Sequence, residues 1–486
     1  MSQETEERER TAPEDTPDPR RWRILGVTLV VGFMVLLDVT IVNVAIPSMR
    51  AGLDTTAGAV QWVVSGYALA LGLVLVSGGR LGDAHGRRVV MLVGLAGFVL
   101  SSAAAGLAPH VAVLVGARLV QGFAAGLLTP QSSGLIQSLF RGPERGVAFG
   151  LFGFTVSVSS AIGPVLGGLL IAFFGAENGW RWIFLVNVPI GLVLLVAIAR
   201  LVPGRLDDAP RDTRLDLPGA AFLGVTVLAL LYPVVSLESG RRWPLLLLLL
   251  VPVAGAAFVR RERRVVHSGG EPLLDLGLLR ATPGYASGIL VGSLYFTGFT
   301  GVFLVLSVFL QEGLDYTPLH AGLLLTPFAV GSAVASPLAG RLVSRVGRPI
   351  TVVALGVMMA GLVALAVVVP ALDGDLPWWA LAAPLLVAGL GGGAVVSPNI
   401  TLSLAEVPPR MGGAAGGALQ TGQRIGAAIG AAVLMTTYQV AVARTDDPGT
   451  SLRWALGASV ALLLAAWAAA VWSWRYEPEV SASSGS

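Results

Sequence analysis

Long runs of apolar residues, each bounded by charges, glycine or proline, recur along almost the whole chain. About 20 consecutive apolar residues are needed for a helix to cross the hydrocarbon core of a bilayer. The pattern therefore predicts an all-α membrane protein with fourteen transmembrane helices. We place these helices near residues 24 to 46, 59 to 78, 89 to 108, 111 to 130, 147 to 174, 182 to 199, 218 to 237, 243 to 259, 284 to 310, 319 to 339, 349 to 370, 378 to 400, 411 to 436 and 454 to 474.

Charged segments divide the predicted helices into groups of six, two and six. The two most highly charged internal loops, at 202–214 and 260–264, bracket the central pair. The sequence GRLGDAHGRR at 79–88 has a later copy, GRLVSRVGRP at 340–349, and internal repeats are typical of two-halved transporters. We expect a disordered cytoplasmic tail at 1–23, a six-helix bundle at 24–201, a linker with two extra transmembrane helices at 202–264, a second six-helix bundle at 265–475 and a cytoplasmic tail at 476–486.

The positions of the arginines predict the orientation in the membrane. All 32 basic residues are arginine, and with the N-terminus inside most of them fall in cytoplasmic loops, as the positive-inside rule requires. We therefore expect a multi-pass protein of the cell (cytoplasmic) membrane with both termini in the cytoplasm. The exceptions are six arginines on the outer side and two within helices: Arg50, Arg181, Arg241, Arg242, Arg444 and Arg453, and Arg118 and Arg424.

Composition and missing motifs exclude other functional classes. With 54% hydrophobic and only 13% charged residues, the chain has more apolar surface than a soluble globule can bury. The net charge of +3 is spread over short loops, so we expect no nucleic-acid partner. The chain has no lysine, so it lacks the phosphate-binding GxxxxGK[ST] motif and direct ATP drive through it. With no cysteine, no metal-ligand spacing of histidines and no catalytic constellation, we predict neither an enzyme, nor a metal site, nor a cofactor.

The first predicted helix contains a buried acid. The segment LDVTIVNVAIP at 37–47 puts Asp38 inside an apolar run. An ionised carboxylate at that depth costs about 2.5 to 3.5 kcal/mol on insertion scales, so it is normally neutralised, paired or in contact with water, and it is a functional candidate. The alternative is that Asp38 lies near the outer end of the helix and accepts hydrogen bonds from Thr40 or Asn43.

Two predicted helices contain arginine. Arg118 opens RLVQGFAAG at 118–126, which also carries Gln121. A buried guanidinium must find an acceptor, and Asp38 is the acid that we place well inside a first-bundle helix, so the two side chains could pair. Alternatively, Arg118 donates to carbonyls of neighbouring helices. Arg424, in QTGQRIGAAIG, has no obvious acidic partner and could contact either a substrate or carbonyls at a helix end.

Two glycine-containing segments are the remaining candidates for a functional role. In GRLGDAHGRR, glycine allows a tight turn, and Asp83 could pair with Arg87 or cap the next helix; a merely solvated turn is the alternative. In SSAIGPVLGG at 159–168, Pro164 removes a backbone hydrogen bond and small residues allow close helix packing; a generic kink is the alternative. The residues of interest are Gly79, Asp83, Gly86, Arg87 and Arg88 in the first segment, and Gly163, Pro164, Gly167 and Gly168 in the second.

Taken in order along the chain, these four segments resemble the signatures of the major facilitator superfamily, and within it the fourteen-span drug:proton antiporters. The resemblance extends from about Arg23 to Trp474. It implies that Asp38 and Arg118 couple transport to protons, that GRLGDAHGRR forms a cytoplasmic gate, and that the segment around Pro164 is the conformational hinge of exporters. The later copy has Ser344 in place of the acid, so its gate function is in doubt.

The resemblance predicts proton-coupled export of small amphipathic organic molecules, an antibiotic or drugs, by alternating access and with resistance as the result. Asn43, Gln121 and Arg424 are candidates for the substrate cavity, and we expect ionised Asp38 to favour the inward-facing state. The expected partners are a small organic substrate, protons and the lipid bilayer. Two competing hypotheses remain: proton-coupled uptake of a metabolite on the same fold, and a membrane protein that transports nothing.

Overall fold

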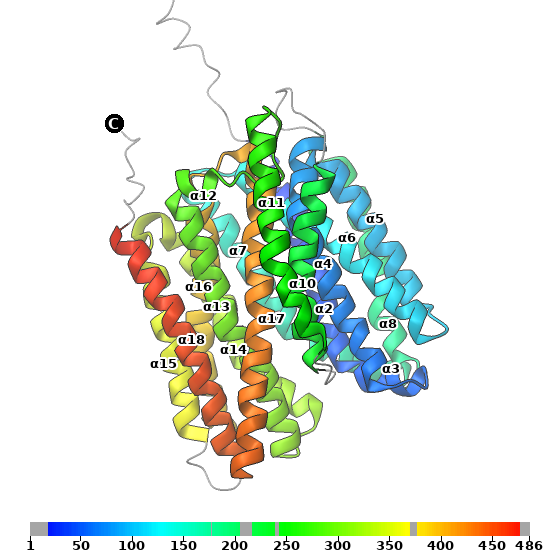
Figure 1. The fold of residues 1–486 in the computed structure, drawn as a ribbon. Coiled ribbons are helices and arrows are strands. Elements are labelled where there is room, and N and C mark those ends of the chain that lie inside the picture. The colour runs from blue at the N-terminus through cyan, green and yellow to red at the C-terminus, as the bar shows by residue number, and fades with distance from the viewer. Residues whose placement is uncertain (1–17, 176, 205–215, 239–242, 370–376, 477–486) are drawn as a thin grey trace, which may run out of the picture.

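A computed structural model describes residues 18–175, 177–204, 216–238, 243–369 and 377–476, and the regular elements in this part of the chain are helices (Figure 1). The first half contains α2 (Arg21–Val44), α3 (Ile46–Gly52), α4 (Ala57–His85), α5 (Arg87–Gly106), α6 (Val111–Leu139), α7 (Gly142–Phe174), α8 (Gly179–Leu185) and α9 (Asn187–Leu201). Next come α10 (Leu217–Glu238), η1 (Trp243–Leu249) and α11 (Leu250–His267). The second half contains α12 (Leu278–Ala281), α13 (Pro283–Val308), η2 (Phe309–Gly313), α14 (Pro318–Val346), α15 (Pro349–Val368), α16 (Trp378–Ser403), η4 (Pro409–Met411), α17 (Gly412–Thr445) and α18 (Pro448–Tyr476).

The helices match the predicted membrane spans closely. Within the described residues, 13 helices are long and apolar enough to cross a membrane. The remaining predicted span, at 218 to 237, coincides with α10, whose apolar segment Leu217–Pro233 is shorter than the other thirteen. The sixth and eighth spans are each built from two consecutive helical pieces, α8 with α9 and η1 with α11.

Several helices continue past the apolar runs that predict them. The segment 79–85, predicted as part of a loop, is the last two turns of α4, and only Gly86 forms the turn to α5, with φ +94°. Helix α6 likewise continues to Leu139. A helix that leaves the hydrocarbon core can still satisfy its backbone hydrogen bonds internally, so polar residues do not have to end it. The predicted loop at 79–88 was wrong for this reason.

The two largest apolar clusters of buried side chains lie one in each half of the chain. The cluster of the first half includes Met34, Leu71, Phe98 and Leu128, from α2, α4, α5 and α6. That of the second half includes residues of α13 to α18. We call α2 to α9 the first bundle and α13 to α18 the second bundle.

The two bundles meet along two pairs of helices, α4 with α17 and α7 with α14, where glycines let the backbones approach. A Cβ atom on Gly79 of α4 would lie 2.1 Å from the carbonyl oxygen of Gly413 in α17. A Cβ atom on Gly146 of α7 would lie 2.3 Å from the carbonyl oxygen of Gly340 in α14. Close approach of this kind requires small residues at the contact.

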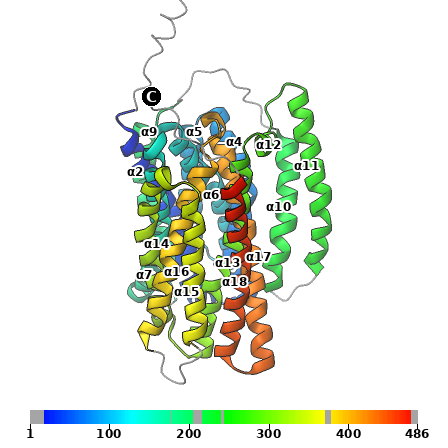
Figure 2. The same cartoon turned by 90° about the vertical axis from the view of Figure 1, so that its left-hand side faces the viewer.

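Helices α10 and α11 stand at one side of the molecule, outside both bundles (Figure 2). Leu231 of α10 packs on Leu69 of α4, and Ile425 of α17 joins the same apolar cluster. Phe258 of α11 packs in a second cluster with Val76 of α4 and Ala418 of α17. The pair therefore covers the line along which α4 and α17 meet.

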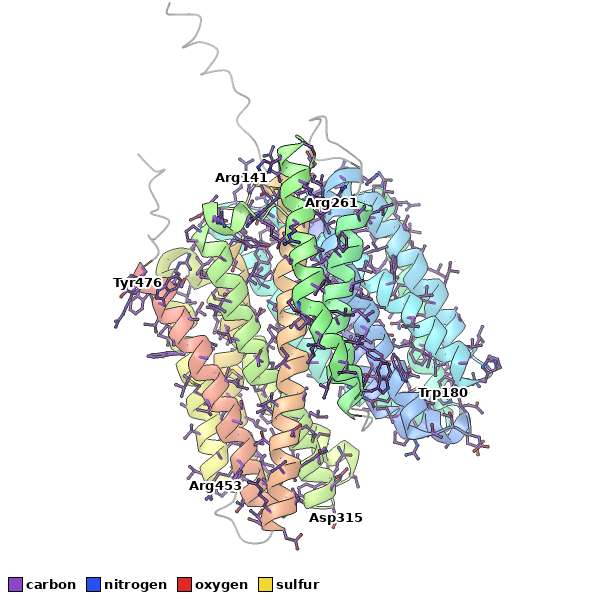
Figure 3. The ribbon with its side chains drawn as sticks, in the orientation of Figure 1. Arg141, Trp180, Arg261, Asp315, Arg453 and Tyr476 are labelled. Atoms are coloured by element: carbon purple, nitrogen blue, oxygen red, sulfur yellow. The ribbon has the colours of Figure 1, made fainter. Side chains whose placement is uncertain are left out.

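Labelled residues mark the two ends of the helical body in Figure 3. Arg141, Arg261 and Tyr476 lie at one end, which we call the arginine-rich end, and Trp180, Asp315 and Arg453 lie near the other (Figure 3). In Figure 1, α4 and α17 lie close together at the arginine-rich end and separate toward the opposite end. The structure is therefore one in which the bundles are joined at the arginine-rich end.

Candidate functional site

Asp38 is the centre of a buried polar cluster in the first bundle. Its side chain on α2 has no exposed surface, and it forms an ion pair with Arg118 of α6. Its Oδ1 atom also accepts hydrogen bonds from Nε2 of Gln121 and Nδ2 of Asn187, each at 3.0 Å. A buried charge is tolerated only when it is paired and its remaining lone pairs are hydrogen-bonded, and these three donors meet that condition.

Arg118 is held by contacts on every side. Its Nε atom donates to the carbonyl oxygen of Val63 at 3.0 Å, and Nη1 donates to Oε1 of Gln121 at 2.7 Å as well as to Asp38. Its guanidinium lies over the ring of Tyr67, 4.1 Å from the centroid, and 5.5 Å from that of Phe184. Stacking on aromatic faces adds cation–π attraction to the ion pair. Five helices of the first bundle thus contribute to one charge-neutral cluster.

The hydrogen bonds of this cluster show which of the two expected sets of partners Asp38 has: it pairs with Arg118 and does not bond Thr40 or Asn43. Thr40 donates to carbonyl oxygens of Leu37 and Ser159, rather than to Asp38. Asn43 is exposed, outside the Asp38 cluster. Gln121, expected to line the substrate cavity, has no exposed surface in this conformation, because it bridges Asp38 and Ser102.

Sequence reasoning missed Asn187. This residue begins α9 and is 1% exposed. It stands in FLVNVPIG, a run in which one asparagine among apolar residues was the available signal. A polar side chain within a membrane helix needs a partner, and Asp38 on α2 provides it.

Asp83 joins the two bundles at the arginine-rich end. Its carboxylate, 1% exposed, pairs with Nη2 of Arg87 at 2.9 Å. It also accepts hydrogen bonds from the backbone N–H groups of Gly413, at 3.1 Å, and Ala414, at 2.9 Å. These groups lie in the first turn of α17, where a carboxylate satisfies free donors and interacts favourably with the helix dipole. We had considered Asp83 as a cap for the next helix, and it caps α17 of the other bundle instead.

Further contacts strengthen this junction. Arg87 donates to the carbonyl oxygen of Pro409 at 3.0 Å, and Gln137 of α6 donates to that of Val407 at 2.9 Å. Arg88 does not take part, because it donates to the carbonyl oxygen of Ala199 within the first bundle. In the later copy of the motif, Ser344 donates only to the local carbonyl oxygen of Arg341, so no equivalent carboxylate bridge forms there.

The segment around Pro164 packs α7 against α2, next to Asp38. Helix α7 runs without interruption through Pro164. A Cβ atom on Gly163 would lie 2.0 Å from Oγ1 of Thr40, and one on Gly167 would lie 3.0 Å from Cγ1 of Ile41. Gly168 has no neighbour within 4 Å of such an atom, so it does not share this packing role. Two of the four predicted hinge residues therefore form the tight contact.

Arg424 lies on α17, in the second bundle, and is partly buried. One turn earlier on the same helix, Gln420 donates to Oγ of Ser133 in α6. This part of α17 therefore lies against the first bundle.

The arrangement separates two chemical tasks. A buried carboxylate with one ion-pair partner can exchange a proton. When Asp38 is protonated and loses its charge, the electrostatic attraction that holds Arg118 in this position is lost. A carboxylate that caps a helix of the other bundle can hold one end of the molecule closed. Contacts of these two kinds, if they are made and broken in turn, are elements from which alternating access can be built.

Comparison with known proteins identifies relatives over most of the chain. A sequence profile described as Major Facilitator Superfamily matches residues 28–431. The "Probable actinorhodin transporter" of Streptomyces coelicolor is 36% identical over 468 residues, covering 92% of this chain and 80% of the relative. "Puromycin resistance protein pur8" of Streptomyces alboniger is 38% identical, covering 90% and 85%. The "Tetracenomycin C resistance and export protein" of Streptomyces glaucescens is 32% identical, covering 85% and 75%.

Solved structures share the arrangement of helices. The human organic anion transporter MFSD10 (TETRAN) superposes with a TM-score of 0.68 at 18% identity, covering 93% of this chain and 100% of that structure. The proton:xylose symporter XylE superposes with a TM-score of 0.64 at 17% identity, covering 94% and 96%. At these identities the likeness concerns the fold alone.

Proposed function

Because this chain belongs to the major facilitator superfamily, we propose that it exports small amphipathic organic molecules, antibiotics among them, in exchange for protons. Three of its relatives are named for transport of, or resistance to, actinorhodin, puromycin and tetracenomycin C. Export of a toxic compound is the direct route from a transporter to resistance.

The observation that carries proton coupling is the Asp38 cluster. A fully buried carboxylate, balanced by Arg118 and two amides, costs free energy to maintain in a membrane and stabilises less than an apolar core would. The presence of this carboxylate in the membrane is explained if it gains and loses a proton in each transport cycle. A charge crossing the membrane potential releases about 2.3 kcal/mol per 100 mV, which is an adequate source of energy for export.

We propose that the arginine-rich end faces the cytoplasm, with both termini on that side, in the cell membrane. The two bundles then rock about a central cavity, and the residues around Asp83 form the cytoplasmic gate. The described conformation is closed at this gate while the Asp38–Arg118 ion pair is intact. That ionised Asp38 favours the inward-facing state stays a prediction; in the described conformation the ion pair is present with the bundles joined at the arginine-rich end. In the cycle we propose, this is the state that receives a proton from outside.

The test of this function is proton movement in everted membrane vesicles with an acidified lumen. Addition of puromycin, actinorhodin or tetracenomycin C should raise the lumenal pH, because each molecule that enters the lumen is exchanged for protons that leave. Vesicles without the protein provide the baseline. A drug-dependent fall in lumenal pH would instead indicate movement of drug and proton in the same direction, and would refute antiport.

Substitution of Asn187 by alanine should slow this exchange about tenfold or more. A hydrogen bond to a charged group contributes about 1.5 to 3 kcal/mol, and this change removes one of the two amide donors to Asp38. The measurement is the initial rate of drug-evoked alkalinisation. Asn178→Ala is the matched control, because Asn178 is exposed and bonds only Arg181. An unchanged rate in Asn187→Ala would exclude a role for this amide in positioning the carboxylate.

A further inference from the structure

Arg424 is a membrane-embedded charge without a counter-ion. Within the described residues it makes no hydrogen bond or ion pair, whereas Arg118 is paired on every side. Its guanidinium nitrogens are not fully buried. The six long helices of the second bundle, α13 to α18, contain no aspartate or glutamate. An arginine at this depth is costly and is normally paired or directed into a water-filled cavity, so this bundle holds a cation that the protein itself does not neutralise.

The packing of α17 fixes the direction in which Arg424 faces. Gly426 and Gly430 contact α13, since Cβ atoms on them would lie 2.2 Å and 2.0 Å from backbone oxygens of Ser293 and Thr297. In a helix with 3.6 residues per turn, residue 424 lies on the opposite side from residues 426 and 430. Ile425 and Ala428 pack against the apolar cluster formed by Leu69 of α4 and two residues of α10. Arg424 therefore faces away from α13 and toward the first bundle.

The neighbours of Arg424 come from both bundles. One turn away along α17, Gln420 donates to Oγ of Ser133 in α6 at 3.2 Å. Two turns before Arg424 and on the same face of α17, Gly417 lies against α4, since a Cβ atom there would be 2.4 Å from the carbonyl oxygen of Leu75. A group that binds Arg424 therefore sits between the bundles, where a transported molecule must pass. Asp38, the carboxylate of the buried cluster in the first bundle, is already bound to Arg118, Gln121 and Asn187.

We propose that Arg424 binds the anionic group of the exported molecule, a carboxylate or an ionised phenol, and that the preferred substrates are aromatic organic anions. The proposal rests on the export function proposed above. A planar guanidinium offers paired donors that match a carboxylate, and charge-assisted hydrogen bonds of this type are about twice as strong as neutral ones. Their strength increases further where water is excluded.

The test compares acids with their own methyl esters, which differ in charge but hardly in shape. The full-length protein is placed in nanodiscs of zwitterionic lipid, and binding of fluorescent aromatic acids, pyrenebutyrate among them, is measured by fluorescence anisotropy. The native protein should bind an acid at least about tenfold more tightly than its ester. Arg424→Gln should remove this preference by weakening the acid alone, and Arg424→Lys should retain part of it.

Two controls separate binding from folding. Arg453→Gln removes an exposed arginine at the end of α18 and should leave both affinities unchanged. The melting temperature of Arg424→Gln should equal or exceed that of the native protein, because no internal partner loses its donor. A melting temperature lowered by several degrees would assign Arg424 a structural role and overturn the proposal.

The binding measurements test the anion site, and the vesicle measurements test the antiport function. Equal affinity for acid and ester, failure of every acid to bind, or acid binding that survives in Arg424→Gln would overturn the anion site. Because binding is measured without a gradient, it is independent of coupling. Acids that bind through Arg424 but evoke no proton movement in vesicles would leave the anion site intact and overturn the antiport function.

Discussion

Substitution of Asp38 by asparagine should reduce drug-evoked proton movement to the level of vesicles without the protein. Asparagine has the same shape but cannot take up and release a proton, so the ion pair with Arg118 is lost permanently. The measurement is alkalinisation of the acidified lumen of everted vesicles on addition of drug. Downhill movement of drug, followed without a pH gradient, should persist, because the substrate site is unaltered.

This substitution also carries a predictable cost in stability. Removal of one partner of a buried ion pair leaves an uncompensated charge and destabilises by about 3 to 5 kcal/mol. The double variant Asp38→Asn with Arg118→Gln removes both charges and should recover much of that stability without recovering coupling. Thermal melting of the two variants in detergent distinguishes loss of coupling from loss of folding. Proton movement at the native rate in Asp38→Asn would rule out Asp38 as the coupling residue.

Substitution of Gly79 by valine should arrest the protein with its cytoplasmic gate open. The Cβ atom alone would lie 2.1 Å from the carbonyl oxygen of Gly413, a backbone atom that cannot move aside without displacing α17. The conformation described here then becomes inaccessible, and transport should fall to background. Gly116→Val is the matched control, because a Cβ atom there has no neighbour within 4 Å.

The arrest can be observed directly, since the chain contains no cysteine. A single Ala414→Cys reporter lies in the first turn of α17, 4% exposed behind Asp83. In everted vesicles, where the cytoplasmic face is outside, a membrane-impermeant maleimide should label this cysteine rapidly in Gly79→Val and slowly in Gly116→Val. Equal labelling rates in the two variants would show that the contact between Gly79 and Gly413 does not control closure.

The sequence predicted helices better than it predicted contacts between them. A membrane span has to be apolar over its whole length, so positions of helices follow from composition. Their ends were less certain, because nothing forces a helix to stop at the edge of the hydrocarbon core. Helix α4 shows this: its apolar run ends near residue 78, and the helix ends at His85.

Contacts between polar residues that are far apart in the chain are harder to predict from the sequence than the helices are. The ion pair between Asp38 and Arg118 could be predicted from the sequence, because each residue is a rare charge in an apolar run. The bonds from Gly413 and Ala414 to Asp83 could not be foreseen, because their donors are backbone N–H groups at a helix start. Sequence reasoning did not identify Asn187, because burying a neutral amide costs less free energy than burying a charge. An asparagine in an apolar run is therefore a weaker sign of function than an aspartate or arginine. The bond from Gln121 to Asp38 could not be foreseen either, since spacing does not reveal which partner an amide meets.

The position of α10 and α11 has a consequence for molecules that are dissolved in the lipid. Where α4 meets α17, a second layer formed by Leu231 and Phe258 separates the junction from the bilayer. Where α7 meets α14, aliphatic side chains such as Val334 and Leu338 are exposed instead. When the end that we propose to be cytoplasmic opens, the two lines of contact between the bundles are therefore not equivalent. In the proposed cycle, a hydrophobic compound in the inner leaflet would reach the space between the bundles by lateral diffusion past α7 and α14, because α10 and α11 cover the side where α4 meets α17.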